Sequence, residues 1–270
     1  MKPLIHLFGD SFLYTCAFNK AYTYEKFVPE SLLAYQISGQ TLIYHQSGEM
    51  VLEAGQFLLG RRNQFAKSIK VPEADKEYQC ISILLTNERL QQYALDNGIV
   101  CQERYQGARN ILLKSNNMLK GYFLSVIPYT ESGETVSKRM ASIKVIEAIT
   151  LLLEMRPDLK SFLFDFTDPK KQDLEQFMLK NFHYNAPLEH FAKLCGRSLT
   201  SFKRDFLDIF KTPPGTWLKD KRLSEAYYLI KKKSRKPQDI YLDLGFENLS
   251  HFYTSFKQKY GVTPAEISQK

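Results

Sequence analysis

A pattern of large apolar residues recurs after fifty residues near the end of the chain, and no other feature of the sequence constrains the fold as strongly. In both copies the apolar residues stand at offsets 0, 3, 7 and 11, which places them on one face of an α-helix. The two sets are Leu199, Phe202, Phe206 and Phe210, then Leu249, Phe252, Phe256 and Tyr260. We therefore predict two helices of one design, each with a buried aromatic face.

The residues that flank these helices repeat in the same way. Ser198 and Asn248 stand where the two helices begin, and both residue types are good N-caps. Before each cap lies a short helical pattern that ends in a tight turn, at Gly196 in the first copy and at Gly245 in the second. A repeat of helix, tight turn and helix is the helix-turn-helix plan, so the sequence predicts two such units in tandem.

A single helix is predicted between the two units. From Pro214 to Lys232 the apolar residues follow the spacing 0, 3, 4 and 7. Such a helix is roughly 27–30 Å long, which is close to the ~34 Å turn of B-DNA. We expect the two units to enter successive major grooves on one face of a duplex, over a site of about 17–20 base pairs.

The outward face of each second helix carries the groups that we expect to touch DNA bases. These residues are Thr200, Ser201, Lys203 and Arg204 in the first unit and Ser250, His251 and Thr254 in the second. Lys203 and Arg204 can donate to O6 and N7 of guanine, and arginine can make both bonds at once. The second unit offers shorter hydrogen-bonding groups, with Ser255 also predicted to face outward, so we expect it to be the less specific of the two.

A further set of residues is predicted to hold the DNA backbone. The set comprises Ser198, Asn248, Lys257, Lys232 and Arg235. Lys232 and Arg235 belong to a basic cluster, residues 231–236, for which a solvated helix C-terminus is an equally good explanation. Residues 170–270 hold 19 Lys and Arg against 11 Asp and Glu, whereas residues 1–169 hold 18 of each. A polyanion is therefore expected as the partner of the C-terminal half alone.

The first hundred residues show short apolar runs separated by glycine-containing turns. The predicted strands are 32–37, 41–46, 50–52, 56–60 and 80–85, a pattern typical of a sandwich or small barrel. From about residue 87 the period becomes helical, and the segment from Ser137 to Met155 carries a broad apolar stripe. We take Ile146 and Ile149 on this stripe as a candidate dimer surface, with packing on the domain's own sheets as the alternative. Residues 165–171 are predicted to form the interdomain linker.

The second helix-turn-helix unit resembles the signature of the AraC/XylS family of bacterial transcription regulators. The matching residues are Gly245-Phe246-Glu247-Asn248-Leu249-Ser250-His251-Phe252, Phe256-Lys257 and Tyr260-Gly261-Val262-Thr263-Pro264. The first unit and the connecting helix match the family at Ala192, Ser198, Phe202, Phe206, Arg222 and Ala226. Two positions depart from the family pattern, because Tyr241 stands where a small residue is usual and Lys211 where a glycine is usual. The resemblance implies that both units bind adjacent major grooves through the base-contacting residues named above.

The N-terminal half resembles the family's cupin-like sensor domain at residues 37–42 and 52–57. Gly60-Arg61-Arg62 is similar to the type III secretion activator branch, a resemblance that implies control by a protein partner rather than by a sugar. The expected fold is therefore α+β with two domains. Residues 1–165 are expected to form a cupin-like β-sandwich or barrel with helices that serves regulation or dimerisation, and residues 170–270 an all-α, AraC-type domain with tandem helix-turn-helix units.

Several kinds of chemistry find no support in the sequence. His6 and His45 are the histidines of the N-terminal half, too few for a metal-binding cupin. The sequence has no phosphate-binding glycine loop and no nucleophile elbow, so we expect no enzyme, no cofactor and no metal. It also shows no apolar run of about 18 residues, no secretory signal and no CxxC pair, which favours a cytoplasmic, nucleoid-associated protein that contacts no membrane.

Together these features predict a sequence-specific DNA-binding transcription regulator, an activator controlled through its N-terminal domain. Its expected partners are double-stranded DNA, RNA polymerase, a second copy of the chain, and a protein or small-molecule effector. One alternative is a small-molecule-sensing regulator or repressor, with an apolar effector lined by Tyr35, Tyr44 and Phe57. Another is an architectural protein that binds DNA without sequence preference.

Overall fold

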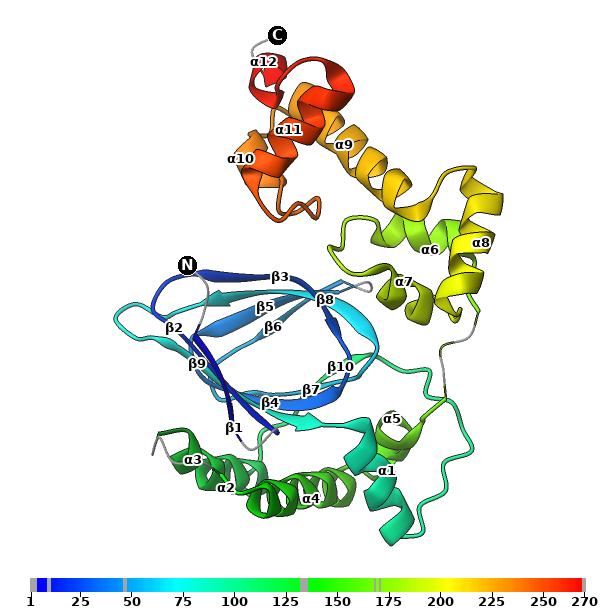
Figure 1. Cartoon of the computed structure of the whole chain (residues 1–270). Coiled ribbons are helices and arrows are strands. Elements are labelled where there is room, and N and C mark those ends of the chain that lie inside the picture. The colour runs from blue at the N-terminus through cyan, green and yellow to red at the C-terminus, as the bar shows by residue number, and fades with distance from the viewer. Residues whose placement is uncertain are drawn as a thin grey trace. The chain divides into compact units, whose positions relative to one another are not determined.

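The computed structural model describes residues 4–8, 11–45, 48–131, 136–167, 169 and 171–268. The chain divides into two compact units, Met1–Thr23 with Val28–Thr167 and Tyr24–Phe27 with Asp168–Lys270 (Figure 1). The division after Thr167 falls inside the segment that the sequence predicts to link two domains.

The strands form two sheets. The larger sheet has the strand order β1 (Leu4–Phe8), β2 (Phe12–Ala17), β9 (Tyr78–Leu85), β4 (Ser31–Ser38), β7 (Phe57–Gly60) and β10 (Asn110–Leu113), with antiparallel pairing throughout. The smaller sheet has the order β3 (Ala21–Val28), β8 (Gln64–Val71), β5 (Gln40–His45) and β6 (Gly48–Leu52). The five predicted strands correspond to β4, β5, β6, β7 and β9. The predicted fold class, a β-rich part followed by a helical part, is confirmed.

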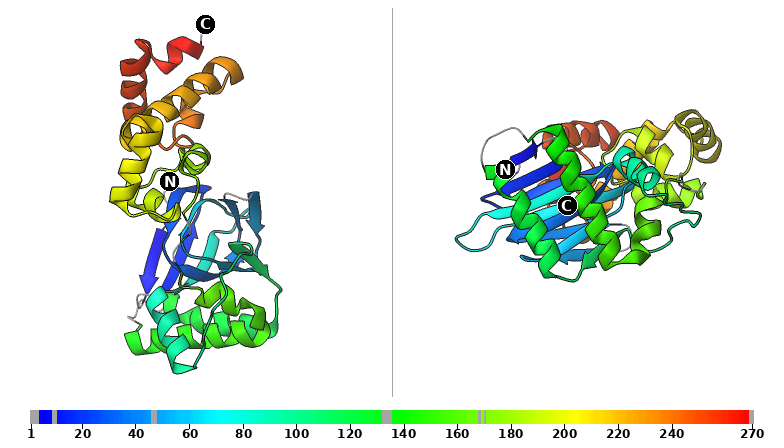
Figure 2. Two further views of the ribbon diagram at one scale, coloured as in Figure 1. Left: turned by 90° about the vertical axis from the view of Figure 1, so that its right-hand side faces the viewer. Right: turned by 90° about the horizontal axis from the view of Figure 1, so that it is seen from below.

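Helices cover one face of the larger sheet. They are α1 (Asn87–Asp96), α2 (Asn117–Val126), α4 (Lys138–Met155) and α5 (Lys160–Phe164), with the short α3 (Pro128–Glu131) and the 3-10 turn η1 (Pro157–Leu159) between them. Figure 2 shows helices of this layer lying across the strands in the view from below. Leu33 and Phe57 of the sheet share one apolar core with Phe123 of α2 and Ala148 of α4.

A second, smaller core lies between the two sheets. Successive side chains of a strand point to opposite faces, so Leu33 packs against the helices while its neighbour Ala34 packs in this inner core. Ile43 of β5 and Leu52 of β6 complete the inner core from the smaller sheet. The β-rich part is therefore a sandwich of two sheets, with a layer of helices on the outer face of the larger sheet.

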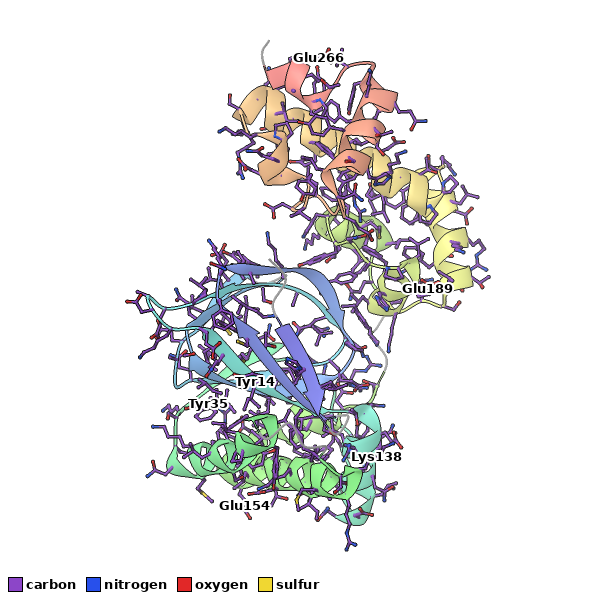
Figure 3. The ribbon with its side chains drawn as sticks, turned by 60° about the vertical axis from the view of Figure 1, so that its left-hand side comes forward. Tyr14, Tyr35, Lys138, Glu154, Glu189 and Glu266 are labelled. Atoms are coloured by element: carbon purple, nitrogen blue, oxygen red, sulfur yellow. The ribbon has the colours of Figure 1, made fainter. Side chains whose placement is uncertain are left out.

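The three residues predicted to line an effector pocket do not meet. The rings of Tyr35 and Phe57 stack with centroids 4.8 Å apart, and both contact Phe123 on the side of the sheet that faces the helices. Figure 3 labels Tyr35 where the sheet meets the helical layer. Tyr44 follows the inner-core residue Ile43 on β5, so it points away from the space between the sheets. These three residues therefore line no common pocket, contrary to the prediction.

The two residues predicted to form a dimer surface are separated by the packing of α4. Ile149 is fully buried in the core with Val145, Ala148 and Leu152, which follow the helical spacing i, i+3, i+4 and i+7. Ile146 is 47% exposed on the outer side of the same helix. The prediction for Ile149 is therefore wrong, because the inner half of the wide apolar stripe packs on the domain's own sheet.

Asp165 belongs to the N-terminal compact unit rather than to the linker. Nη2 of Arg61 lies 2.8 Å from Oδ2 of Asp165, and Arg62 donates to the Asp165 backbone carbonyl at 2.7 Å. Although burial opposes it, hydrogen bonds from Thr167, Tyr105 and Arg61 hold the pKa of the Asp165 carboxyl below its ordinary value. The two arginines of the Gly60-Arg61-Arg62 motif thus fix the last segment before the linker.

The C-terminal compact unit is helical, as predicted. Its elements are α6 (Leu174–Asn181), α7 (Leu188–Leu194), α8 (Leu199–Phe210), α9 (Pro214–Lys233), α10 (Pro237–Ile240), α11 (Leu249–Tyr260) and α12 (Pro264–Ser268). The pairs α7–α8 and α10–α11 are the two helix-turn-helix units, and α9 joins them (Figure 1).

The repeated aromatic faces form the cores of the two units. Phe206 and Phe210 of α8 pack against Trp217 of α9, with ring centroids 5.6 and 4.7 Å from the indole. Phe252 and Phe256 of α11 are fully buried in a core that includes residues from the far half of α9. α9 therefore serves as a shared support, and these aromatic rings are not available for stacking on bases.

Candidate nucleic-acid interface

The second helix of each unit begins at a capping side chain. Oγ of Ser198 accepts a hydrogen bond from the Ser201 amide at 3.2 Å, and Oδ1 of Asn248 accepts one from the His251 amide at 2.8 Å. Both caps are exposed. The capping oxygens and the Ser201 and His251 amides are engaged with each other, whereas the N–H groups of the first two residues of each helix have no acceptor within the helix and can bind an anion from solvent.

The turn of the second unit is held by the connecting helix. Arg222 of α9 donates to the backbone carbonyls of Phe182 at 2.8 Å, Tyr184 at 2.7 Å and Gly245 at 3.1 Å. Gly245 has φ of +78°, and a Cβ atom there would lie 2.6 Å from the His183 carbonyl oxygen. The glycine is required both by its left-handed backbone and by this close approach.

The predicted base-contacting residues of the first unit lie on one side of α8. Thr200, Lys203 and Arg204 are exposed, while Ser201 is half-buried and its Oγ lies 3.1 Å from that of Ser198. The Arg204 side chain is 70% exposed. This face presents two cationic side chains on the side opposite the aromatic core.

An acidic residue that the sequence pattern did not reveal lies beside Arg204. Oδ1 of Asp205 accepts hydrogen bonds from Nε and Nη2 of Arg204, at 3.3 and 3.1 Å. Its Oδ2 lies 3.1 Å from Nε of Arg197 and 3.5 Å from Nζ of Lys171. The hydrogen bonds from Arg197 and Arg204 hold the pKa of the Asp205 carboxyl below its ordinary value. The only hint in the sequence is an acid directly after an arginine, which is too common to single out.

The residues of the second helix-turn-helix unit that were predicted to face DNA fall into an exposed set and one buried residue. Ser250, His251, Thr254 and Lys257 are exposed on α11. Ser255 is 3% exposed, so the prediction that it faces outward is wrong. It lies three residues after Phe252, and that spacing brings it to the edge of the buried face.

Basic side chains gather where α9 ends. Residues 231–236, which include Lys232 and Arg235, are exposed, and Ser234, directly after the last residue of α9, caps the helix with φ of 52°. This cluster suits both explanations that the sequence left open, since cations are favoured at a helix C-terminus and also attract phosphates.

The two departures from the family pattern have local explanations. Lys211 adopts the left-handed conformation, φ of 54°, that Gly261 adopts at the equivalent place with φ of 74°. Tyr241 is half-buried at the edge of the second core, whereas Ala192 at the matching place is 1% exposed. The short helical pattern predicted before Gly245 forms a helix only through Ile240 and continues as turns. The larger side chain thus lies at the edge of the second core rather than inside it.

Two further observations concern other kinds of site. In the parts of the chain that the structure describes, no helix has both the length and the apolar character that crossing a membrane requires. Over the same residues, no group of three or more His, Cys, Asp or Glu side chains is placed to hold a metal ion.

Comparison with protein families gives two matches. Residues 191–270 match a family described as a helix-turn-helix domain. Residues 31–162 match a family described as the ExsA N-terminal regulatory domain. Both matches fall on segments for which the sequence indicated a resemblance.

Individual proteins similar to this chain include regulators from several bacteria. The HTH-type transcriptional regulator ExsA of Pseudomonas aeruginosa is 24% identical over 242 residues, 86% of this chain and 84% of ExsA. The virulence regulon transcriptional activator VirF of Yersinia enterocolitica is 29% identical over 96 residues, 36% of this chain and 35% of VirF. A crystal structure of apo ToxT from Vibrio cholerae aligns over 96% of this chain and 97% of its own, with 15% identity and a TM-score of 0.46.

Proposed function

The chain belongs to the AraC/XylS family of bacterial transcription regulators, in the branch that includes ExsA, and from this premise we propose that it activates transcription by binding one specific DNA site with both helix-turn-helix units. Activation rather than repression of transcription is supported by the similarity to VirF, whose name describes a transcriptional activator. The N-terminal unit is the regulatory part in this proposal.

The observation that carries the proposal is the spacing of two exposed helix faces. α9 has 20 residues, which corresponds to about 30 Å at the rise of an α-helix. Successive major grooves on one face of B-DNA recur at about 34 Å. A connecting helix of this length, with α8 near its beginning and α11 near its end, suits one helix in each of two adjacent grooves.

We propose different roles in DNA recognition for the two helix-turn-helix units. In the first, Lys203 and Arg204 are the base-reading residues, with Thr200 and Ser201 as supporting contacts. The second unit contributes Ser250, His251 and Thr254, whose hydrogen-bonding side chains discriminate less strongly between base pairs than a two-bond arginine contact does. The DNA backbone is held by Ser198 and Asn248 at the helix starts and by Lys257, Lys232 and Arg235.

The N-terminal unit is proposed to respond to a protein partner. The match to the ExsA N-terminal regulatory domain supports control through this unit. Tyr35 and Phe57 pack against α2 and Tyr44 lies on the other sheet, so these three residues do not line one pocket and lend the small-molecule alternative no support. RNA polymerase is the expected second partner, because an activator acts on it at the promoter.

A second copy of the chain is also proposed as a partner. Met140, Ile143 and Ile146 are 39–49% exposed on the outer side of α4 and give it an apolar strip. Ile146→Glu should weaken a dimer without disturbing the buried half of the helix, and the solution mass of the folded variant would test this. A dimer of unchanged stability would remove α4 from the interface.

Selection of bound sequences from random DNA by the full-length protein tests the proposed function. A specific regulator should yield one site of about 17–20 base pairs, bound at least about 1,000-fold more tightly than random DNA at fixed salt. An architectural protein would yield no preferred site. A DNA-binding activator acts where the genome lies, so we place the protein in the cytoplasm, at the nucleoid, and propose no enzymatic role.

A further inference from the structure

The guanidinium of Arg204 is held along one edge. Its Nε and Nη2 atoms both donate to Oδ1 of Asp205, at 3.3 and 3.1 Å. Arginine carries five N–H donors in a planar fork, so these two bonds leave the N–H groups of Nη1 and one of Nη2. Those remaining donors form the edge that makes a two-bond contact with O6 and N7 of guanine. The geometry of the pair is therefore compatible with base recognition rather than competing with it.

Asp205 is itself anchored from the opposite side. Nε of Arg197 lies 3.1 Å from Oδ2 of Asp205, and Nη1 of Arg197 donates to the backbone carbonyls of Gln172 at 2.8 Å and Cys195 at 3.0 Å. The Arg197 side chain is 7% exposed and that of Asp205 17%, whereas that of Arg204 is 70% exposed. A buried, backbone-bound arginine thus fixes the carboxylate, and the carboxylate in turn holds an exposed arginine.

The internal repeat shows where this arrangement is absent. A shift of fifty residues takes Arg204 to Thr254 and Asp205 to Ser255, and Ser255 is buried in the second core. The same shift takes Arg197 to Glu247. The unit without an arginine on its outward face also lacks the anchored acid, so the helix-turn-helix plan does not itself require that acid.

We propose that Asp205 is a positioning residue for DNA recognition, which holds the Arg204 guanidinium with its free edge toward a guanine in the major groove. This inference rests on the proposed base contact of Arg204. A free arginine side chain would lose its rotamer freedom on binding, and a side chain that is already held loses less. The carboxylate also repels nearby phosphates, so it weakens binding to DNA of any sequence.

Asp205 should strengthen the discrimination between base pairs and weaken the affinity for DNA of any sequence. Because these two effects have opposite signs, they can be measured separately. Asp205→Asn should bind random DNA more tightly than the wild type, with a steeper dependence on salt. The same variant should lose roughly two- to tenfold of the discrimination at the base pair where Arg204→Ala loses discrimination. A residue with a merely structural role would instead weaken binding to all DNA.

Asp208→Asn is the matched control. Asp208 is an exposed acid on the same helix, and among the described residues no hydrogen bond joins it to Arg204. Its replacement should raise the affinity for random DNA and leave the discrimination at every base pair unchanged. In the double variant Arg204→Ala with Asp205→Asn, discrimination should equal that of Arg204→Ala alone.

The measurement is equilibrium binding of the full-length variants to the selected site, to its single-base variants and to random DNA, with thermal unfolding as a check of folding. Should Asp205→Asn not fold, Asp205→Glu keeps the charge but moves the carboxylate, and it should lose discrimination while its affinity for random DNA stays unchanged. Unchanged discrimination in the folded variant overturns the proposal, and so does an Arg204→Ala variant that loses discrimination nowhere. A wild-type protein without any preferred site would instead reject the proposed function itself.

Discussion

The first helix-turn-helix unit ends its second helix at Lys211, and the second unit ends its own at Gly261. Both residues are left-handed, with φ of 54° and 74°, and each donates its amide to the carbonyl four residues earlier. Glycine adopts this conformation readily, whereas a lysine there is strained by about 1 kcal/mol or more. The backbone therefore follows the same path at both helix ends, even where the residue opposes it.

The outward faces of the units differ more than their backbones do. The first unit presents Lys203 and Arg204, and the second presents Ser250, His251 and Thr254. The buried faces, by contrast, repeat the same aromatic positions. Packing thus keeps the two units alike, and solvent exposure leaves their chemistry free to diverge.

The largest expected effect concerns the turn of the second unit. Gly245→Ala should lower the free energy of unfolding by about 3 kcal/mol or more, because a left-handed alanine would also collide with the His183 carbonyl oxygen. Gly261→Ala is the control, since φ there is +74° and a Cβ atom would meet nothing within 4 Å. It should lose only about 1 kcal/mol. Denaturant unfolding of the two variants compares them, and equal losses would show that the close approach is unimportant.

The next effect tests the proposed difference in base recognition between the two helix-turn-helix units. Arg204→Ala should lose about 1–3 kcal/mol of binding to the selected site, mainly as lost discrimination at one base pair. Thr254→Ala, at the equivalent place in the second unit, should lose about 0.5–1.5 kcal/mol, as expected for a neutral hydrogen bond. Binding titrations at one salt concentration measure both. A larger loss for Thr254→Ala would reverse the assignment of the more specific unit.

The ends of α8 and α11 provide a third comparison. Lys211→Gly should raise the free energy of unfolding by about 1 kcal/mol, because it relieves the left-handed lysine. Gly261→Lys should lower it by a similar amount for the opposite reason. Thermal unfolding of the two variants would show the opposite shifts, and a destabilised Lys211→Gly variant would contradict this account of the helix end.

The smallest effect is a pH dependence that comes from Asp205 of the first helix-turn-helix unit, where the second unit has Ser255. The pKa of the Asp205 carboxyl lies below its ordinary 3.8 in the folded protein because Arg197 and Arg204 bond to the ionised form. Its contribution to stability is therefore present above the unfolded pKa and is lost as pH falls through the folded pKa. The difference in unfolding free energy between wild type and Asp205→Asn should be constant above about pH 5 and shrink below about pH 3.8. A difference of the same size at pH 3 and pH 7 would show that the ion pairs do not stabilise the fold.

The helical half could be predicted well because its signals are local. Caps at Ser198 and Asn248 and aromatic residues at helical spacing identified α8 and α11. The strands were harder. β8 carries lysines at positions 67 and 70 among its apolar residues, and β10 has four residues only. Such strands owe their existence to pairing with partners distant in the chain, which no short window of sequence contains.

The sequence alone determined the repeat, its buried aromatic faces and its exposed basic groups, because each depends on residue spacing along a single helix. The tertiary structure decided which half of α4 is buried, that Ser255 faces the core, and that Asp205 lies between Arg197 and Arg204. Helical periodicity gives the angle of a side chain around its own axis but not what packs on either side of it. That information comes only from the contacts between elements, so the sequence predicted Arg204 as a candidate base-contacting residue but did not reveal the carboxylate that holds it.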